Sequence, residues 1–347
     1  MKKSPLLYTT LFFNLAIISL PFLFGNATNT NNTIGKKAAF GKVLFFSNAL
    51  SLNNTKSCSS CHDPQFAFTD GYKKSIGIDG YNVKRNAPGL QNISTYPCYT
   101  WADSNIKQLQ QQIQMPLFNH LPNELGWYQN ETNMLQRIAN IYSKNIQSIY
   151  NKNTISLAEM IDCIVAYEST LISYESNYDK YLRGDSNALS ADAKKGMQLF
   201  FSKKLQCGYC HSSKNLGAVS TNSFYNTGLY NVADSNNYPT ADQGLYNITH
   251  NIADKGKFRV PSLRNVGITA PYTHDGSVAT LSEMIDIYSN GGRKLTTGPY
   301  KGNGCKNAFK SPLIKGFTIT PEEKIQLIYF LESLTDSSFI DKQKQKV

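Results

Sequence analysis

The chain carries GKVLFFSNALSLNNTKSCSSCH at residues 41–62 and GMQLFFSKKLQCGYCH at residues 196–211. Both segments hold Gly-x-x-Leu-Phe-Phe-Ser and then Cys-x-x-Cys-His. Self-similarity of this kind indicates that one structural unit occurs twice in the chain. Other elements should then repeat around it, in the same order.

Two predicted helices repeat in this way. ISLAEMIDCIVAYES at 155–169 aligns without gaps with ITPEEKIQLIYFLES at 319–333. Each begins with the Ser/Thr-x-x-Glu spacing of a capping box, at Ser156 and at Thr320, which predicts a helix start. Apolar residues follow at helical spacing, so both segments are expected to be amphipathic helices.

A loop repeats as well. KRNAPGLQNIS at 84–94 and FRVPSLRNVGI at 258–268 both hold Arg, Pro, Leu and Asn in that order, while alternating strand patterns are scarce. Each half therefore runs helix, Cys-x-x-Cys-His, loop and terminal helix. The sequence predicts a mainly α fold with two domains, at residues 28–183 and 184–347, joined at a polar segment around 183–187.

The Cys-x-x-Cys-His order is that of a c-type haem attachment site, where two thiols add to the vinyl groups and the adjacent histidine binds iron. We therefore expect two tandem cytochrome c-like domains, each folded around one covalently bound c-type haem. The attachment residues are Cys58, Cys61, His62, Cys207, Cys210 and His211.

Two other uses of paired cysteines fit less well. A zinc site would need four ligands close together, whereas the two pairs lie far apart in the chain and each ends in histidine. Disulfide oxidoreductases place Cys-x-x-Cys at a helix start after a strand, a context that neither segment shows. Cys98, Cys163 and Cys305 remain; two of them can pair in an exported protein, and Cys163 fits buried helix packing better than chemistry.

The first residues have the pattern of a secretory signal. Lys2 and Lys3 precede the apolar run 5–24 and a small-residue site that ends at Ala27. We expect cleavage after residue 27 and a periplasmic protein without a stable membrane span, a retained membrane anchor being the alternative. Removal of the two lysines lowers the net charge of +11 by two. The remaining positive net charge favours an acidic protein partner. Because the sequence has no Lys/Arg clusters, we do not expect it to bind nucleic acid.

At this level of detail the chain resembles the bacterial di-haem cytochrome c peroxidases and the related MauG-type enzymes. The resemblance covers nearly all of residues 35–340. The motifs that carry it are GKVLFFSNALS, CSSCHDPQFAFTDG, RNAPGLQN, PLFNHLPNELG, CGYCH, FRVPSLRNVGITAPYTHDGSVATL and IQLIYFLESL.

The resemblance implies that the haem at His62 reacts with peroxide and that the haem at His211 stores and passes electrons. It places the distal acid-base carboxylate at Glu124, the distal amide at Gln112 and the aromatic residue between the haems at Trp101. A carboxylate over iron can move a proton between the peroxide oxygens, and an amide can donate a hydrogen bond there. Without the resemblance, an exposed loop Glu, a helix-surface Gln and a core Trp would be the ordinary interpretations.

Two positions depart from one branch of the family. Where many di-haem peroxidases have a histidine that caps the first haem at rest, the matching stretch here offers Ile78, which cannot bind iron. We therefore expect an open first haem unless Tyr81 or another loop residue covers it. For the second haem, Met284 and Tyr288 lie four residues apart on one predicted helical face. The resemblance selects Tyr288, because the MauG branch has Tyr at this position and the peroxidases have Met. An oxygen ligand stabilises ferric iron.

The resemblance also implies a calcium ion between the domains, held by an asparagine and backbone carbonyls. The matching residues are Asn86, Thr269 and Pro271. Calcium takes oxygen ligands of this type.

The leading expectation is a periplasmic peroxidase that reduces hydrogen peroxide to water with electrons from a small cytochrome c or a cupredoxin. The first alternative is a MauG-type enzyme that oxidises aromatic residues of a partner protein through a ferryl state. The second is a di-haem electron carrier or redox sensor without turnover. The resemblance also suggests a homodimer.

Overall fold

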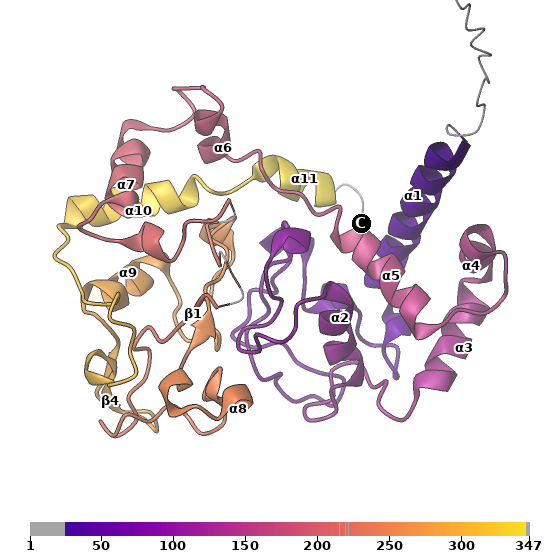
Figure 1. Cartoon of the computed structure of the whole chain (residues 1–347), viewed down its shortest axis with the longest axis horizontal. Helices are drawn as coiled ribbons and strands as arrows, with labels where there is room; N and C mark the ends of the chain where they lie inside the picture. Colours follow the sequence, from indigo (N-terminus) through magenta and orange to yellow (C-terminus); the bar gives the residue numbers. More distant parts are fainter. Residues whose placement is uncertain (1–24, 215, 219, 221, 345–347) are drawn as a thin grey trace, which may run out of the picture.

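The computed structural model describes residues 25–214, 216–218, 220 and 222–344. Figure 1 shows two lobes side by side, one holding α1 to α5 and the other α6 to α10. The helices are α1 (Gly25–Phe45), α2 (Leu109–Phe118), α3 (Glu131–Ile141), α4 (Ser143–Tyr150), α5 (Leu157–Glu168), α6 (Asn177–Leu182), α7 (Ala191–Phe201), α8 (Tyr246–Thr249), α9 (Leu281–Ser289), α10 (Pro321–Glu332) and α11 (Ser337–Lys344).

Strands are few and short in the described part of the chain. β1 (Phe224–Tyr225) pairs with β2 (Phe258–Arg259), and β3 (Lys294–Leu295) pairs with β4 (Gly302–Asn303), both antiparallel. Most of the remaining chain forms loops and single 3₁₀ turns. The predicted mainly α fold is confirmed.

The two repeated helices form as predicted. Ser156 caps α5 and Thr320 caps α10, each in a reciprocal capping box with the glutamate three residues later. α1 packs along α5 in the first lobe, and α7 packs along α10 in the second. The repeat therefore extends from the sequence to the tertiary packing, since an equivalent pair of helices packs together in each lobe.

Each helix pair crosses at a glycine. A Cβ on Gly41 of α1 would overlap the carbonyl of Cys163 in α5, and a Cβ on Gly196 of α7 would overlap the carbonyl of Gln326 in α10. Gly41 and Gly196 open the two copies of Gly-x-x-Leu-Phe-Phe-Ser. The repeated glycine is thus a packing requirement, because any side chain there would push the two backbones apart.

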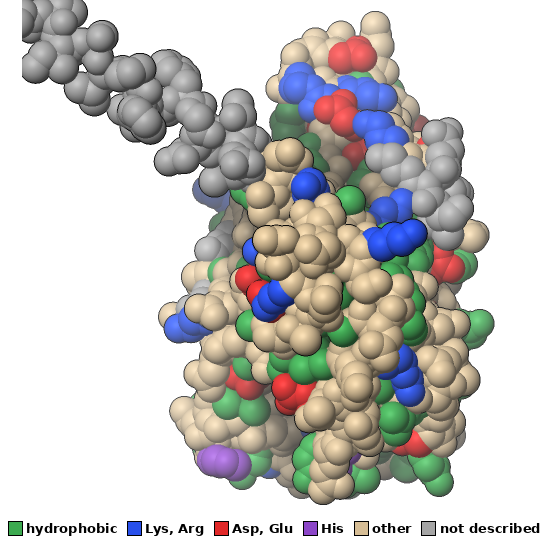
Figure 2. Space-filling view, turned by 90° about the vertical axis from the view of Figure 1, so that its right-hand side faces the viewer, with side chains coloured by type: hydrophobic (Ala, Val, Ile, Leu, Met, Phe, Trp, Pro, Cys, Tyr) green, Lys and Arg blue, Asp and Glu red, His purple; other side chains and the backbone are tan. Residues whose placement is uncertain are grey.

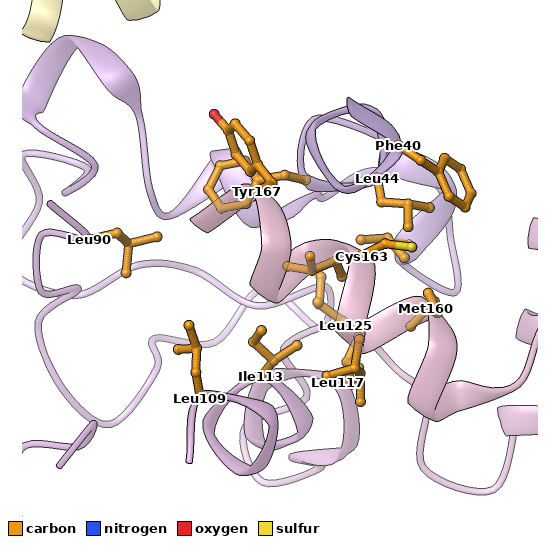
Figure 3. Packing of buried hydrophobic residues seen from close by; sticks show 14 of the residues in the cluster. Phe40, Leu44, Leu90, Leu109, Ile113, Leu117, Leu125, Met160, Cys163 and Tyr167 are labelled. Atoms are coloured by element: carbon orange, nitrogen blue, oxygen red, sulfur yellow. The ribbon is translucent and has the colours of Figure 1, made fainter. Parts of the chain in front are cut away.

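Apolar side chains from α1, α2 and α5 form the core of the first lobe. Figure 3 shows Phe40 and Leu44 beside Cys163 of α5, with Ile113 and Leu117 of α2 below them. Cys163 is fully buried, as predicted. All seven cysteines lie in the described residues and are free thiols, so Cys98, Cys163 and Cys305 form no disulfide in this structure.

Segments from each half reach the other lobe. Tyr178 of α6 packs in the second core, whereas Phe339 of α11 packs in the first. A buried ion pair joins Asp179 to Arg264, with 2.6 Å between carboxylate and guanidinium. The proposed domain boundary at residues 183/184 stays a prediction. α6 lies before this boundary and packs in the second core, and α11 lies after it and packs in the first.

The repeated loops hold the terminal segments in equivalent ways. Asn92 and Asn265 both adopt a left-handed backbone conformation and both precede a 3₁₀ turn. Their backbone N–H groups donate to the carbonyls of Leu171 and Leu334, which follow the two terminal helices. Each Arg-Pro-Leu-Asn loop is thereby fixed to the end of the helix that closes its own lobe.

Residues 1–24 of the predicted leader lie outside the described residues, so the leader stays a prediction. Within the described ranges, no helix combines the length and apolar character needed to cross a membrane. Figure 2 shows one side of the molecule with Lys and Arg side chains interspersed among Asp and Glu. On that face the basic charge is not gathered into one patch.

The helix crossing gives a first prediction. Replacing Gly41 with Ala should lower the free energy of unfolding by about 1–3 kcal/mol, because the new methyl group must displace α1 from α5. Gly35 lies in the same helix with open space around its Cα, so Gly35→Ala should be neutral or more stable by up to about 1 kcal/mol. Denaturant unfolding of both holo-proteins, followed by circular dichroism, measures the difference. Equal stability of the two variants would contradict the account.

Candidate di-haem site

The two Cys-x-x-Cys-His segments have the same backbone geometry. Cys58–Ser60 and Cys207–Tyr209 each form one 3₁₀ turn. The following histidine N–H donates to the carbonyl of the first cysteine, at 3.0 Å for His62 and 3.1 Å for His211. Both turns present free thiols beside the histidine, which is the arrangement that thioether attachment of a haem requires.

Both histidines are prepared to bind iron through Nε2. Nδ1 of His62 lies 2.8 Å from the carbonyl oxygen of Phe68, and Nδ1 of His211 lies 2.8 Å from that of Leu216. A carbonyl only accepts, so Nδ1 carries the hydrogen and Nε2 keeps its lone pair. Burial lowers the pKa of both imidazoles, that of His211 to about 4, which keeps them neutral.

The second lobe contains a cavity of about 310 Å³ beside its haem motif. Cys207, Cys210 and His211 line it on one side, and Met284 and Tyr288 of α9 also line it. A cavity with free thiols, a neutral imidazole and a further donor residue fits a c-type haem with two axial ligands. The residues predicted to bind the second haem are therefore brought together here.

Both candidate sixth ligands, Met284 and Tyr288, line this cavity. Burial raises the pKa of the Tyr288 phenol, and the charges of Cys210 and Cys207 act in the same direction. Met284 and Trp101 both pack against the apolar cluster that holds Phe258. Both residues therefore lie at the cavity, and Tyr288 as the sixth ligand stays a prediction.

In the first lobe, Glu124 lies close to the haem motif. Burial raises the pKa of the Cys61 thiol, and the charges of Asp70 and Glu124 add to the effect. Asn119 at the end of α2 donates to Oε1 of Glu124 at 2.8 Å. Burial raises the pKa of Glu124 while this hydrogen bond lowers it, with a net rise. Such a carboxyl takes up a proton more readily than an exposed one.

Of the other residues predicted for this site, Ile78 contacts the loop that carries Glu124, and Gln112 lies on the helix before that loop. Gln112 is half-buried on α2, whose core-facing residues include Ile113 and Leu117. Ile78 is also half-buried, and its N–H donates to the carbonyl of Asn123 at 2.9 Å. Tyr81 is 71 % exposed, so its side chain does not cover the haem motif in this structure.

Trp101 joins the two halves of the chain. Its indole Nε1 donates to the carbonyl of Asn86 at 2.9 Å, and its own carbonyl accepts from the N–H of Arg259 at 2.8 Å. Trp101 also lines the cavity of the second haem motif. The predicted position between the two sites is compatible with these contacts, and the electron-transfer role stays a prediction.

The three residues predicted to bind calcium also line this cavity: Asn86, Thr269 and Pro271. Nδ2 of Asn86 donates to the carbonyl of Tyr72 at 3.0 Å, and the N–H of Asn86 donates to the carbonyl of His274 at 2.8 Å. The predicted residues are therefore brought together at the contact between the halves. Calcium binding itself stays a prediction.

Sequence reasoning did not assign a site role to Glu168. This residue is 5 % exposed, and its Oε2 has no hydrogen-bond partner among the described residues. Burial raises its pKa to about 8, and its charge raises the pKa of the Cys58 thiol. A buried carboxyl oxygen without a hydrogen-bond partner among the described residues, near a haem motif, fits a site that binds a further group. The only signal in the sequence was its match with Glu332 in the repeat.

Comparisons with known proteins agree with this site. Residues 35–187 match the di-haem cytochrome c peroxidase family. The chain is 32 % identical to the cytochrome c551 peroxidase of Nitrosomonas europaea over 72 % of this chain and 71 % of that protein. It is 27 % identical to the methylamine utilization protein MauG of Methylorubrum extorquens, over 86 % and 78 % of the two chains.

A solved structure described as a MauG-like protein associated with microbial copper homeostasis superposes with a TM-score of 0.84 and 40 % identity. The match covers 88 % of this chain and 91 % of that one. Taken with the two cysteine-histidine motifs and the cavity beside the second one, these similarities show that the chain belongs to the di-haem cytochrome c peroxidase and MauG family.

Proposed function

We propose that this protein is a MauG-type di-haem oxidase, which uses hydrogen peroxide to withdraw electrons from aromatic residues of a partner protein. The observation that carries the proposal is Tyr288 at the cavity of the second haem motif, near both attachment thiols. In the resemblance described above, tyrosine at this position distinguishes the MauG branch from peroxidases with methionine. This order of preference reverses the one that the sequence suggested.

The residues of the first lobe support a reaction with peroxide. The haem held by His62 would supply the metal that polarises peroxide, and Glu124 would take a proton from one peroxide oxygen and return it to the other. Asn119 orients the carboxylate through its 2.8 Å hydrogen bond. Ile78 has no atom able to bind iron, so that face would stay open to peroxide.

The second candidate is a periplasmic cytochrome c peroxidase, supplied with electrons by a small cytochrome c or a cupredoxin. Its support is the similarity to named peroxidases, including one of 30 % identity from a Pseudomonas species that covers 88 % of this chain. Trp101 between the two sites serves this function equally well. The two candidates share the peroxide and differ in what supplies the electrons.

One experiment separates the candidates. Diferric holo-protein receives one equivalent of hydrogen peroxide, its optical spectrum is followed, and a reduced small c-type cytochrome is then added. The proposal predicts a spectral change that persists and is only slowly discharged by the cytochrome. Rapid oxidation of the cytochrome through many turnovers would favour the peroxidase. If peroxide causes no change in the optical spectrum, both candidates fail and a di-haem electron carrier or redox sensor remains.

The carboxylate gives a second prediction. Glu124→Gln should slow the reaction with peroxide by about 100-fold or more, since the amide cannot accept the proton. The wild-type rate should fall as the pH drops through the raised pKa of Glu124, because the carboxylate is the active form, and this fall should be absent in the variant. Stopped-flow rates across pH measure both effects, with Glu131→Gln on the exposed start of α3 as control. Equal rates in wild type and Glu124→Gln would contradict the assigned role.

The sixth ligand gives a third prediction. Tyr288→Phe should convert the second haem from low spin to high spin and raise its reduction potential, since an oxygen ligand that stabilises ferric iron is removed. Met284→Leu, one turn earlier on α9, should leave both properties unchanged. Electron paramagnetic resonance and redox titration provide the measurement. The reverse pattern would make Met284 the ligand and favour the peroxidase.

A further inference from the structure

Three tyrosine rings lead from the second haem cavity to the surface. Tyr238 lines the cavity and is 2 % exposed. Its ring centroid lies 5.4 Å from that of Tyr230, which in turn lies 5.3 Å from that of Tyr300. Tyr300 follows β3 and is 39 % exposed. The three rings are thus a continuous series of contacts with one end at the cavity and the other in solvent.

The middle ring has a proton acceptor. The hydroxyl of Tyr230 donates to Oδ2 of Asp275 at 2.5 Å. Burial opposes ionisation of Asp275, but the neighbouring His274 and hydrogen bonds from Thr273, Tyr230 and Ser277 lower its pKa to about 2. Asp275 is therefore a carboxylate at neutral pH, ready to accept the phenolic proton.

A cation beside the ring of Tyr230 couples oxidation of this tyrosine to the loss of its phenolic proton. The guanidinium of Arg293 lies 4.5 Å from the ring centroid of Tyr230 and is held there by a 2.9 Å hydrogen bond to Ser277. Positive charge on the ring would be repelled by Arg293. An electron can leave Tyr230 at low cost only if the proton moves to Asp275 in the same step.

We propose that Tyr230 is a redox-active tyrosine that carries an oxidising equivalent from the second haem site to Tyr300, where a partner protein is oxidised. This inference rests on the proposed function, with hydrogen peroxide as the two-electron oxidant. In each step one electron leaves Tyr230 toward the haem site through Tyr238, and the phenolic proton passes to Asp275, leaving a neutral tyrosyl radical. An electron from the partner, passed through Tyr300, then restores Tyr230, and Asp275 returns the proton.

The chain around Tyr300 also limits the kind of partner. Between Asp286 and Glu322 the sequence has no acidic residue and six basic ones: Arg293, Lys294, Lys301, Lys306, Lys310 and Lys315. Four of them, Lys294, Lys301, Lys306 and Lys315, are exposed, whereas Arg293 and Lys310 are partly buried. Exposed basic residues in such a segment attract negatively charged proteins. The partner should therefore present an aromatic residue within an acidic surface.

Spin trapping tests the route directly. Diferric holo-protein is treated with hydrogen peroxide in the presence of a nitroso spin trap, and tryptic peptides are analysed by mass spectrometry for trapped tyrosines. Wild type should carry an adduct at Tyr300, whereas Tyr230, which is 4 % exposed, is out of reach of the trap. Tyr230→Phe keeps the ring but has no phenolic proton, so the adduct at Tyr300 should fall to the level found without peroxide. Tyr329→Phe, which removes an exposed tyrosine of α10 outside the series, should leave the adduct at Tyr300 unchanged.

Two outcomes would overturn the inference and are distinguishable. If peroxide changes the haem spectrum but Tyr300 is trapped equally well in Tyr230→Phe, or not at all in wild type, the tyrosine route is wrong while the proposed function stands. If peroxide causes no spectral change, the proposed function fails and the route fails with it, because its oxidant is lost. A second measurement does not depend on turnover. In freeze-quench electron paramagnetic resonance of the wild type, ring-deuterated tyrosine should give a narrower radical signal than ordinary tyrosine, because the radical is on a tyrosine ring.

Discussion

The close crossing of two helices at a glycine is the constraint on which the rest of the structure depends. In the first lobe Gly41 lets α1 contact the backbone of α5 at Cys163, and in the second Gly196 lets α7 contact α10 at Gln326. The haem motif follows the first helix of each pair, and the Arg-Pro-Leu-Asn loop is bonded to the end of the second. The position of each histidine and of the loop around it therefore follows from how closely the two helices approach.

The two lobes share this frame and differ in what faces the haem motif. In the first lobe the loop after α2 brings a proton-accepting carboxylate, Glu124, near Cys61. In the second lobe the equivalent space is bounded by α9, which brings Tyr288 to the cavity. Under the proposed function, a base suits the site where peroxide would react, whereas a phenol that would bind iron suits the site that would hold charge. Under the proposed function, duplication followed by divergence of these two segments would account for the different roles of the two lobes.

Much of the frame could be predicted from the sequence because the signals are local. Capping boxes at Ser156 and Thr320 and the spacing of the haem motifs depend only on residues a few positions apart. Contacts between distant segments could not be predicted in this way. The burial of Glu168 and the ring contacts from Tyr238 to Tyr300 arise only when residues far apart in the chain are brought together by folding. A composition with 21 tyrosines gives no indication of which rings meet.

The central claim is that one haem site is open to peroxide and the other is closed by Tyr288. Electron paramagnetic resonance of the resting diferric holo-protein, before any oxidant or reductant is added, tests it most directly. The account predicts one high-spin ferric signal from the site at His62 and one low-spin signal from the site at His211, in equal amounts. Two low-spin signals would contradict it, because the first site would then have a sixth protein ligand although Ile78 occupies the position of the capping histidine.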